Sequence, residues 1–264
     1  MVELRDVSYR VGDARILERV SVSFQPGRFN VVLGPNGAGK STLLRIATGL
    51  AAPTSGTVLY DDRPLESFDA SELARKRAVL SQHVSLAFPL PAADVAMMGR
   101  YPHYDRVPTP LDRDIVRRAI DVVGMTDKRN QSYPTLSGGE QQKIQLARVL
   151  AQIWNYDSPG DGEHRPHRYL FLDEPTSSLD VHYQIHLLDT ARALLDYDCT
   201  VVAILHDINV ALEYGQHFVL LERGAVALDV DRADAIGQAD LERIFQVRAR
   251  RIDDGARGFW RFSL

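Results

Sequence analysis

Short apolar runs alternate with amphipathic stretches along most of this chain. Three runs are continuously apolar and end abruptly in polar or glycine-rich sequence: Phe29–Leu33 (FNVVL), Tyr169–Leu172 (YLFL) and Thr200–Leu205 (TVVAIL). Continuous apolar runs are typical of parallel strands that are buried on both faces. Helical patterns lie between them, over Lys40–Leu50, Leu111–Val123, Glu140–Trp154 and His182–Leu195. Strands that alternate with helices predict an α/β fold with a mainly parallel sheet.

Other parts of the chain have different patterns. Residues 1–30 and Gly56–Leu65 predict short strands and turns, which we interpret as an antiparallel side sheet. Residues 87–135 are helix-rich and punctuated by proline, which predicts an inserted helical subdomain. The stretch 154–168 is rich in Gly, Pro, Asp and His without periodicity, which predicts an exposed loop.

These patterns predict one domain over the whole chain. Its expected parts are a core with its β subdomain (1–86 and 166–264) and a helical subdomain (87–165) that carries the polar loop at 154–168.

Composition excludes several classes of function. The chain has 264 residues and a formal net charge of -4, so it offers no overall positive field for a nucleic acid. No segment has the ~20 apolar residues that cross a bilayer, and the amino terminus has no signal-peptide pattern. Any membrane role must therefore act through another chain. The single cysteine, Cys199, lies in an apolar run and fits a core residue in a reducing cytoplasm.

The strongest motif is GPNGAGKS, which matches G-x-x-x-x-G-K-[ST] between the strand ending at Leu33 and a helix. Its glycines let successive backbone N–H groups face one anion, and the helix amino terminus adds positive charge. Lys40 is expected to reach the β- and γ-phosphates of ATP, and the Ser41 hydroxyl to bind Mg²⁺. The predicted ATP-binding residues here are Gly34, Pro35, Asn36, Gly37, Ala38, Gly39, Lys40, Ser41 and Thr42.

Two adjacent acids follow the strand YLFL, at the sheet edge where open α/β sheets bind ligands. Asp173 is the predicted Mg²⁺ ligand, and Glu174 is the predicted base that orients or deprotonates the attacking water. A helix cap is the alternative role for such a pair. His206 follows the strand TVVAIL at the same edge and is a predicted catalytic residue, which can donate a hydrogen bond to the γ-phosphate or orient the catalytic water. A structural role is the alternative.

The segment Leu136–Glu140 (LSGGE) opens a helix, because Ser137 and Glu140 have the spacing of a capping box. Gly138 and Gly139 leave bare N–H groups at the positive helix end, which predicts a second anion site. One chain has a single phosphate loop, so the second site makes sense if it closes over the nucleotide of another copy. This predicts two ATP molecules between two chains.

Two histidine pairs suggest metal binding, but weakly. His164 and His167 lie in the polar loop without a cysteine or a second ligand pair. His182 and His186 are four apart on a helix but lack the Glu of H-E-x-x-H. We interpret both pairs as surface residues.

With these motifs, the sequence resembles the nucleotide-binding subunits of ATP-binding cassette (ABC) transporters, whose signature motif is LSGGE. The resemblance covers nearly the whole chain and implies a RecA-like core, ATPase activity with ATP and Mg²⁺, and a homodimer. It implies that Gln82 binds ATP and Mg²⁺ and senses the membrane partner, and that Tyr9 stacks on adenine, although Tyr9 can also be a core residue. It also implies a dimer-interface loop of Ser178, Leu179 and Asp180.

The segment Phe88–Asp105 is similar to importers of iron chelates, haem and cobalamin, and its SLAFPL and MMGRYPH runs look most like haem importers. The resemblance implies two permease subunits that this segment meets, a periplasmic haem-binding protein, and a place at the cytoplasmic face of a bacterial inner membrane. Ferric siderophore or cobalamin import is the alternative. A soluble ATPase of iron-sulfur assembly is a further alternative. An ATPase of the DNA-repair type would need a long heptad insertion, and one that acts on ribosomes would need two cassettes in tandem; the sequence has neither.

Overall fold

The computed structural model describes residues 1–81, 88–154, 167–176, 179–253 and 258–264. They form two compact units, one of Met1–Ser67 with Leu188–Leu264 and one of Phe68–Leu187. The second unit takes in two strands that the sequence analysis assigned to the core, so the proposed subdomain bounds stay a prediction. No helix in the described ranges is long and apolar enough to cross a membrane.

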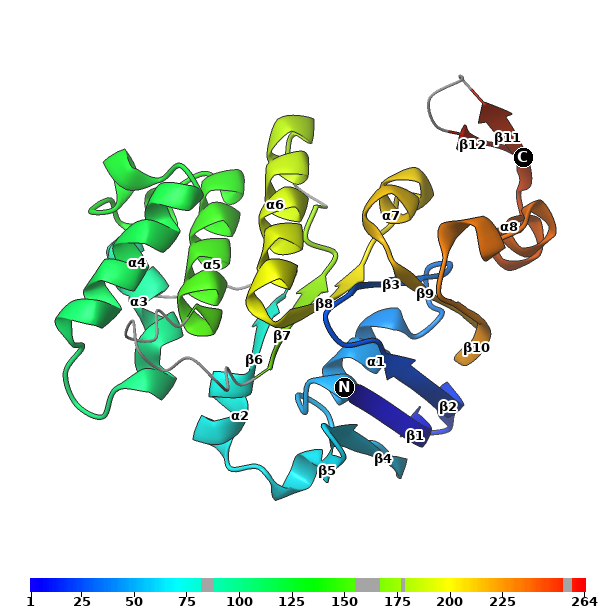
Figure 1. The fold of residues 1–264 in the computed structure, drawn as a ribbon, viewed down its shortest axis with the longest axis horizontal. Helices are drawn as coiled ribbons and strands as arrows, with labels where there is room; N and C mark the ends of the chain where they lie inside the picture. Colours follow the sequence, from blue (N-terminus) through cyan, green and yellow to red (C-terminus); the bar gives the residue numbers. More distant parts are fainter. Residues whose placement is uncertain (82–87, 155–166, 177–178, 254–257) are drawn as a thin grey trace. The chain divides into compact units, whose positions relative to one another are not determined.

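The first unit contains the antiparallel sheet that the amino-terminal pattern predicts, with strand order β2-β1-β4-β5 (Figure 1). Val2 of β1 pairs with Phe24 of β2 on one side and with Tyr60 of β4 on the other, and all three side chains are buried. The bounds are β1 (Val2–Val11), β2 (Ala14–Phe24), β4 (Ser55–Tyr60) and β5 (Arg63–Pro64), followed by the 3-10 helix η1 (Leu65–Ser67).

A second group of strands in this unit is parallel and buried at its centre and has an antiparallel, partly exposed strand at one edge. The strand β3 (Phe29–Leu33) pairs in parallel with β8 (Cys199–Ile204) on one side and β9 (His217–Glu222) on the other, and β10 (Ala225–Val230) pairs antiparallel to β9. Every residue of β3 is buried, which confirms the prediction of a strand covered on both faces. Helices α1 (Lys40–Ala47) and α7 (Ile208–Tyr214) follow β3 and β8.

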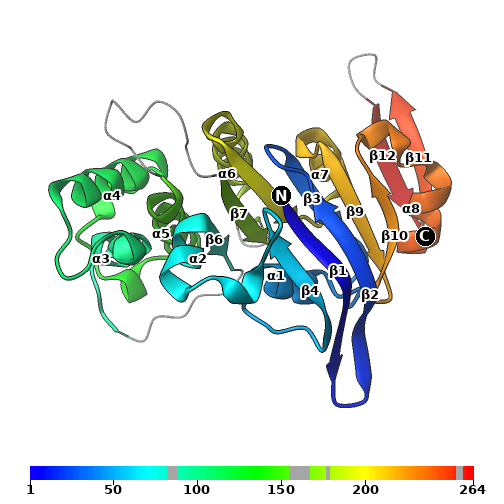
Figure 2. The same cartoon turned by 60° about the horizontal axis from the view of Figure 1, so that its bottom comes forward.

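The chain after β10 folds as a helix and a hairpin, which Figure 2 shows in orange and red. The side chain of Asn209 donates to the backbone carbonyl of Trp260 (3.0 Å) and accepts from its N–H (2.7 Å), so the hairpin is attached to α7. The elements after β10 are η6 (Ala233–Ala235), α8 (Gln238–Phe245), β11 (Arg248–Asp253) and β12 (Gly258–Ser263). Earlier in this unit, the 3-10 helix η5 (Leu194–Tyr197) precedes β8.

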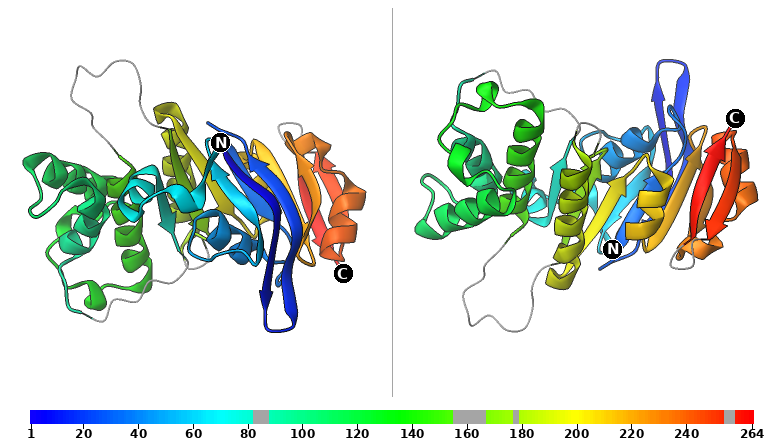
Figure 3. Two further views of the ribbon diagram at one scale, coloured as in Figure 1. Left: turned by 90° about the horizontal axis from the view of Figure 1, so that it is seen from below. Right: turned by 90° about the horizontal axis from the view of Figure 1, so that it is seen from above.

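The second unit combines a parallel strand pair with a cluster of helices, shown mainly in green in Figure 3. Leu80 of β6 pairs with Leu172 of β7. Helix α5, in which Ile144 and Leu150 are buried, packs against α3 and α4. The bounds are α2 (Ala70–Lys76), β6 (Arg77–Leu80), α3 (Ala92–Met97), η2 (Met98–His103), α4 (Pro110–Val122), η3 (Thr126–Lys128), η4 (Tyr133–Thr135), α5 (Gly138–Ile153), β7 (Arg168–Asp173) and α6 (Val181–Ala193).

The predicted helices and strands are all present, and their ends differ from the predictions for local reasons. The first helix ends at Ala47 rather than Leu50 because Gly49 adopts a left-handed conformation with φ 72°. Gly49 N–H donates to Ile46 and Leu50 N–H donates to Arg45, which is the Schellman pattern that terminates helices.

Candidate functional site

The phosphate loop lies between β3 and α1, and its glycines are required by the geometry. Gly34 has φ 146°, and a Cβ there would lie 2.2 Å from the backbone oxygen of Leu221. Gly39 has φ 99°, and a Cβ there would lie 2.7 Å from Leu17 Cδ2. Because both positions combine positive φ with a close neighbour, no larger residue fits either without a shift of the backbone.

Lys40, the first residue of α1, is 5 % exposed. Its Nζ donates to the carbonyl oxygens of Gly34 (2.9 Å) and Pro35 (3.0 Å), so the loop wraps around the ammonium group. Ser41 and Thr42 follow in the first helical turn and are half-buried. A cation inside a glycine-rich loop at a helix amino terminus is the arrangement that binds a phosphate group.

His206 leaves the same edge of the parallel strands as the phosphate loop. Val32 of β3 pairs with Ile204 of β8, so the chain passes from both strands into loops at adjacent positions. His206 is exposed, and the next residue, Asp207, caps α7 by accepting from the N–H groups of Asn209 (2.8 Å) and Val210 (3.1 Å). The acid that caps this helix therefore fixes the backbone beside the histidine.

Tyr9 belongs to the same unit as the phosphate loop. It lies on β1 opposite Leu17, the residue whose side chain faces Gly39, and it is half-buried. Its surroundings suit either a core residue or a partly exposed aromatic surface.

Asp173 and Glu174 lie in the second unit, where β7 ends. Both are half-buried, and Glu174 has φ 50°, a left-handed conformation that is uncommon for a residue with a side chain. Such strained backbone persists where the surrounding structure enforces it, and it occurs often at active sites. Gln82, which would follow the neighbouring strand β6, lies outside the described residues.

The segment after Glu174 is held by glutamine side chains of the same unit. Gln142 of α5 donates to the carbonyl of Pro175 (2.6 Å). Gln184 of α6 donates to the carbonyls of Thr176 (3.1 Å) and Leu179 (2.9 Å). The sequence analysis missed both glutamines, because an amide four or five residues beyond the residue that precedes a helix carries no distinctive signal. Of the predicted interface loop, Ser178 lies outside the described residues, and Asp180 is exposed and accepts from Tyr183 N–H (2.8 Å).

The capping box of the signature motif, Leu136–Glu140, is confirmed. Ser137 Oγ accepts from Glu140 N–H (3.4 Å), and Glu140 Oε2 accepts from Ser137 N–H (3.0 Å). Lys128 also bonds to Glu140, and the hydrogen bonds from Lys128 and Ser137 lower the pKa of Glu140 to about 2. A Cβ placed on Gly138 or Gly139 would meet nothing within 4 Å. Unlike Gly34 and Gly39, these two glycines are not required by any close neighbour among the residues that the structure describes.

One member of each histidine pair contacts a backbone carbonyl or an aromatic ring. His186 Nε2 contacts the carbonyl of Val122 (2.8 Å), and the ring of His167 lies edge-on to Tyr169 at 5.0 Å. His164 falls outside the described residues. Among the residues described, no group of three or more His, Cys, Asp or Glu is arranged to hold a metal ion.

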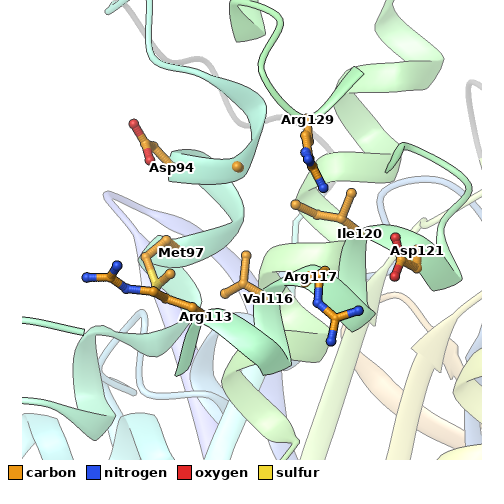
Figure 4. Close-up of a pocket in the computed structure, with 9 residues that line it drawn as sticks. Asp94, Met97, Arg113, Val116, Arg117, Ile120, Asp121 and Arg129 are labelled. Carbon is orange, nitrogen blue, oxygen red and sulfur yellow. The ribbon is translucent and has the colours of Figure 1, made fainter. Parts of the chain in front are cut away.

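A pocket of about 220 Å³ lies between α3 and α4 of the second unit (Figure 4). Met97, Val116 and Ile120 form its apolar surface, and Figure 4 shows charged side chains around it. None of the residues that line it is one of the predicted nucleotide-contacting residues.

Comparisons with known proteins agree with the motifs. The model of the family described as ABC transporter matches residues 17–157. The hemin import ATP-binding protein HmuV of Rhodopseudomonas palustris (strain BisA53) is 40% identical over 97% of this chain and 92% of that protein. The protein of the same name from Bordetella bronchiseptica is 42% identical over 94% of this chain and 93% of that protein.

Solved structures share the fold. A dimeric structure of MJ0796, described as a bacterial ABC transporter cassette, superposes with a TM-score of 0.73 and 28% identity, and covers 88% of this chain and 98% of that one. The predicted α/β phosphate-loop fold is therefore confirmed.

Proposed function

The chain belongs to the ABC transporter family as an ATP-hydrolysing subunit, and we propose that its hydrolysis energises the import of haem. The observation that carries this proposal is the 40% identity to a hemin import ATP-binding protein over 97% of the chain. The matched 97% of the chain spans the segment Phe88–Asp105, which the sequence analysis associates with haem importers. The same ATPase mechanism would serve a ferric siderophore or cobalamin importer.

ATP binding begins at the phosphate loop. We assign the β- and γ-phosphates to backbone N–H groups of the loop Gly34–Ser41, except at Pro35, which has none, and to the ammonium of Lys40. The carbonyl oxygens of Gly34 and Pro35 hold that ammonium inside the loop, so it is pre-positioned for an anion. Tyr9 would stack on the adenine ring, which needs a partly exposed aromatic on β1.

Hydrolysis requires a base and a group that orients water. Glu174 would accept a proton from the attacking water. Its left-handed backbone indicates that the surrounding chain fixes its position, as a catalytic base requires. His206 would donate a hydrogen bond to the γ-phosphate or orient the attacking water.

The hydroxyl of Ser41, the carboxylate of Asp173 and the amide oxygen of Gln82 are the proposed Mg²⁺ ligands. Such oxygen donors fit Mg²⁺, which would neutralise charge on the phosphates.

A second chain would complete each site. The amino end of α5 presents the hydroxyl of Ser137 and the N–H groups of Gly138 and Gly139. A Cβ added at either glycine would meet nothing within 4 Å. Glycine there is explained if a phosphate of the nucleotide on the partner chain comes that close. Ser178, Leu179 and Asp180 would cross the same interface. Two chains would then close on two ATP molecules. The dimeric structure of the cassette MJ0796 supports the dimer.

The proposed membrane partner is a pair of permease subunits, served by a periplasmic haem-binding protein. The segment that follows the Gln82 region exposes large apolar side chains, with Phe88 at 71% and Tyr101 at 59%. Such side chains suit a protein contact. The chain would then act at the cytoplasmic face of a bacterial inner membrane.

The test is to purify the chain with its membrane partners from the native host and measure ATPase activity of the complex. Haem, a ferric siderophore and cobalamin are added in turn with the matching binding protein. Of the three loaded binding proteins, we expect only the one that carries haem to stimulate hydrolysis. Stimulation by another ligand would replace haem with that ligand. Co-purification with soluble assembly factors and no membrane protein would overturn the transport function.

A further inference from the structure

A buried arginine closes the carboxyl end of the signature helix α5. Arg100 belongs to η2 and is 3 % exposed. Its Nη1 donates to the carbonyl oxygens of Ala151 (2.8 Å) and Trp154 (2.9 Å), which are among the last carbonyls of α5. The last carbonyls of an α-helix receive no N–H donor from a following helical turn, and the negative end of the helix dipole favours a cation there.

The same arginine also binds the amino end of α4. Its Nε donates to Asp112 Oδ1 (2.9 Å), and Asp112 is 3 % exposed. The other carboxylate oxygen of Asp112 accepts from the N–H (2.9 Å) and hydroxyl (2.6 Å) of Thr109, the residue that caps α4. Arg100 therefore joins the negative end of one helix to the acid that caps the positive end of another.

Electrostatic shifts agree with this geometry. Burial lowers the pKa of Arg100, while the bond to Asp112 acts in the opposite direction. Burial raises the pKa of Asp112, but the hydrogen bonds from Thr109 and Arg100 outweigh it and hold that pKa below its ordinary value. Both groups are charged at neutral pH, and each is the partner that compensates the burial of the other.

The residues on either side of Arg100 bring η2 against α5. A Cβ on Gly99 would lie 2.0 Å from the carbonyl oxygen of Arg148, so only glycine permits this approach. His103 Nε2 contacts the carbonyl of Gln152 (2.9 Å). Gln152 in turn donates to the carbonyls of Ala74 (2.8 Å) and Arg77 (3.0 Å), which links the end of α5 to the start of β6.

We propose that Arg100 is a positioning residue for transport coupling, which locks η2, the carboxyl end of α5 and the amino end of α4 into one body. Exposed Tyr101 lies next to Arg100 in η2, and Ser137 lies at the far end of the 16-residue helix α5, about 24 Å away at 1.5 Å per residue. A displacement imposed on Tyr101 is therefore transmitted along the helix to the signature motif. This inference rests on the proposed function, because it assigns the displacement to a permease that contacts η2.

The experiment measures ATPase activity of the chain in its complex with the permease, with and without the haem-loaded binding protein. The test variant is the double substitution Arg100→Met with Asp112→Asn, which removes both buried charges together while an amide can still accept from Thr109. Arg100→Lys is the conservative variant. Arg118→Met is the matched control, because Arg118 is a half-exposed arginine on α4.

The double variant should keep the KM for ATP and the basal rate, whereas its stimulated kcat should fall by about tenfold or more. Arg100→Lys should recover part of the stimulation, and Arg118→Met should match the unmodified chain. A merely structural role would lower basal and stimulated rates in proportion to the folded fraction and leave their ratio unchanged.

A folded double variant with the full stimulation ratio would overturn the inference. If that variant does not fold, the ratio measured for Arg100→Lys decides in the same way. An unmodified complex that no binding protein stimulates would instead refute the proposed function.

Discussion

Alanine in place of Gly138 should make the isolated chain more stable and the working ATPase slower. Gly138 is the first residue of α5, and an added Cβ would meet nothing within 4 Å. Alanine is favoured over glycine by about 0.5–1 kcal/mol within a helix, because it loses less backbone freedom on folding. In the first turn we expect the lower part of this range, roughly 0.5 kcal/mol of added stability.

The opposite effect on activity follows from the proposed second nucleotide contact. A methyl group at Gly138 would occupy the space assigned to the partner chain's γ-phosphate and lower kcat by at least about tenfold, or ~1.4 kcal/mol of transition-state stabilisation. Urea unfolding of the isolated chain measures the first effect, and steady-state ATPase of the dimer measures the second. The nucleotide affinity of the isolated chain, measured by titration, should not change.

Gly34→Ala is the matched comparison, because the same substitution should there destabilise the chain. Its Cβ would lie 2.2 Å from the backbone oxygen of Leu221 at φ 146°, so the loop or β9 must shift. A Gly138→Ala chain that is less stable than the original would refute the open-space argument. A more stable chain with unchanged ATPase would refute the role of the signature glycines at the second nucleotide.

Three further predictions test other parts of the account. Lys40→Ala should weaken ATP binding in a fluorescent-nucleotide titration, and unaltered affinity would show that the phosphate site lies elsewhere. Glu174→Gln should keep ATP binding but abolish turnover in a phosphate-release assay, and fast hydrolysis would remove Glu174 from its role. The third prediction concerns His103, whose pKa is lowered from 6.5 to about 4, mainly by burial and secondly by the positive charge of Arg100. The unfolded chain therefore binds more protons between these values, so the free energy of unfolding should fall as pH drops from about 6.5 to 4, with a shallower fall in His103→Gln.

Much of the fold follows from the sequence because its signals are local. The run Phe29–Leu33 is continuously apolar and is buried along its whole length. The S-x-x-E spacing of Ser137 and Glu140 specifies a capping box by hydrogen bonds within one turn of helix, and the structure contains it. The phosphate-loop glycines are likewise predictable from the sequence, because their spacing matches a loop whose backbone requires positive φ at those positions.

Features that depend on the approach of distant segments could not be predicted. The sequence analysis treated Gly99, Arg100 and His103 only as a resemblance to importers, because the partner carbonyls are about 50 residues away in α5. The left-handed backbone of Glu174 has no sequence signal, since a non-glycine residue there is contrary to local preference. The capping box Thr109–Asp112 was visible in the sequence, and it is the signal that could have led to the buried pair.

The central claim is that two chains enclose two ATP molecules, with the signature motif of each chain on the nucleotide of the other. Native mass spectrometry of the Glu174→Gln chain with Mg²⁺ and ATP tests it most directly, since ATP is retained when turnover is blocked. We expect a dimer that carries two ATP molecules and that is lost when Gly138→Ala is added. A monomer with one ATP, or a dimer unaffected by Gly138→Ala, would contradict it.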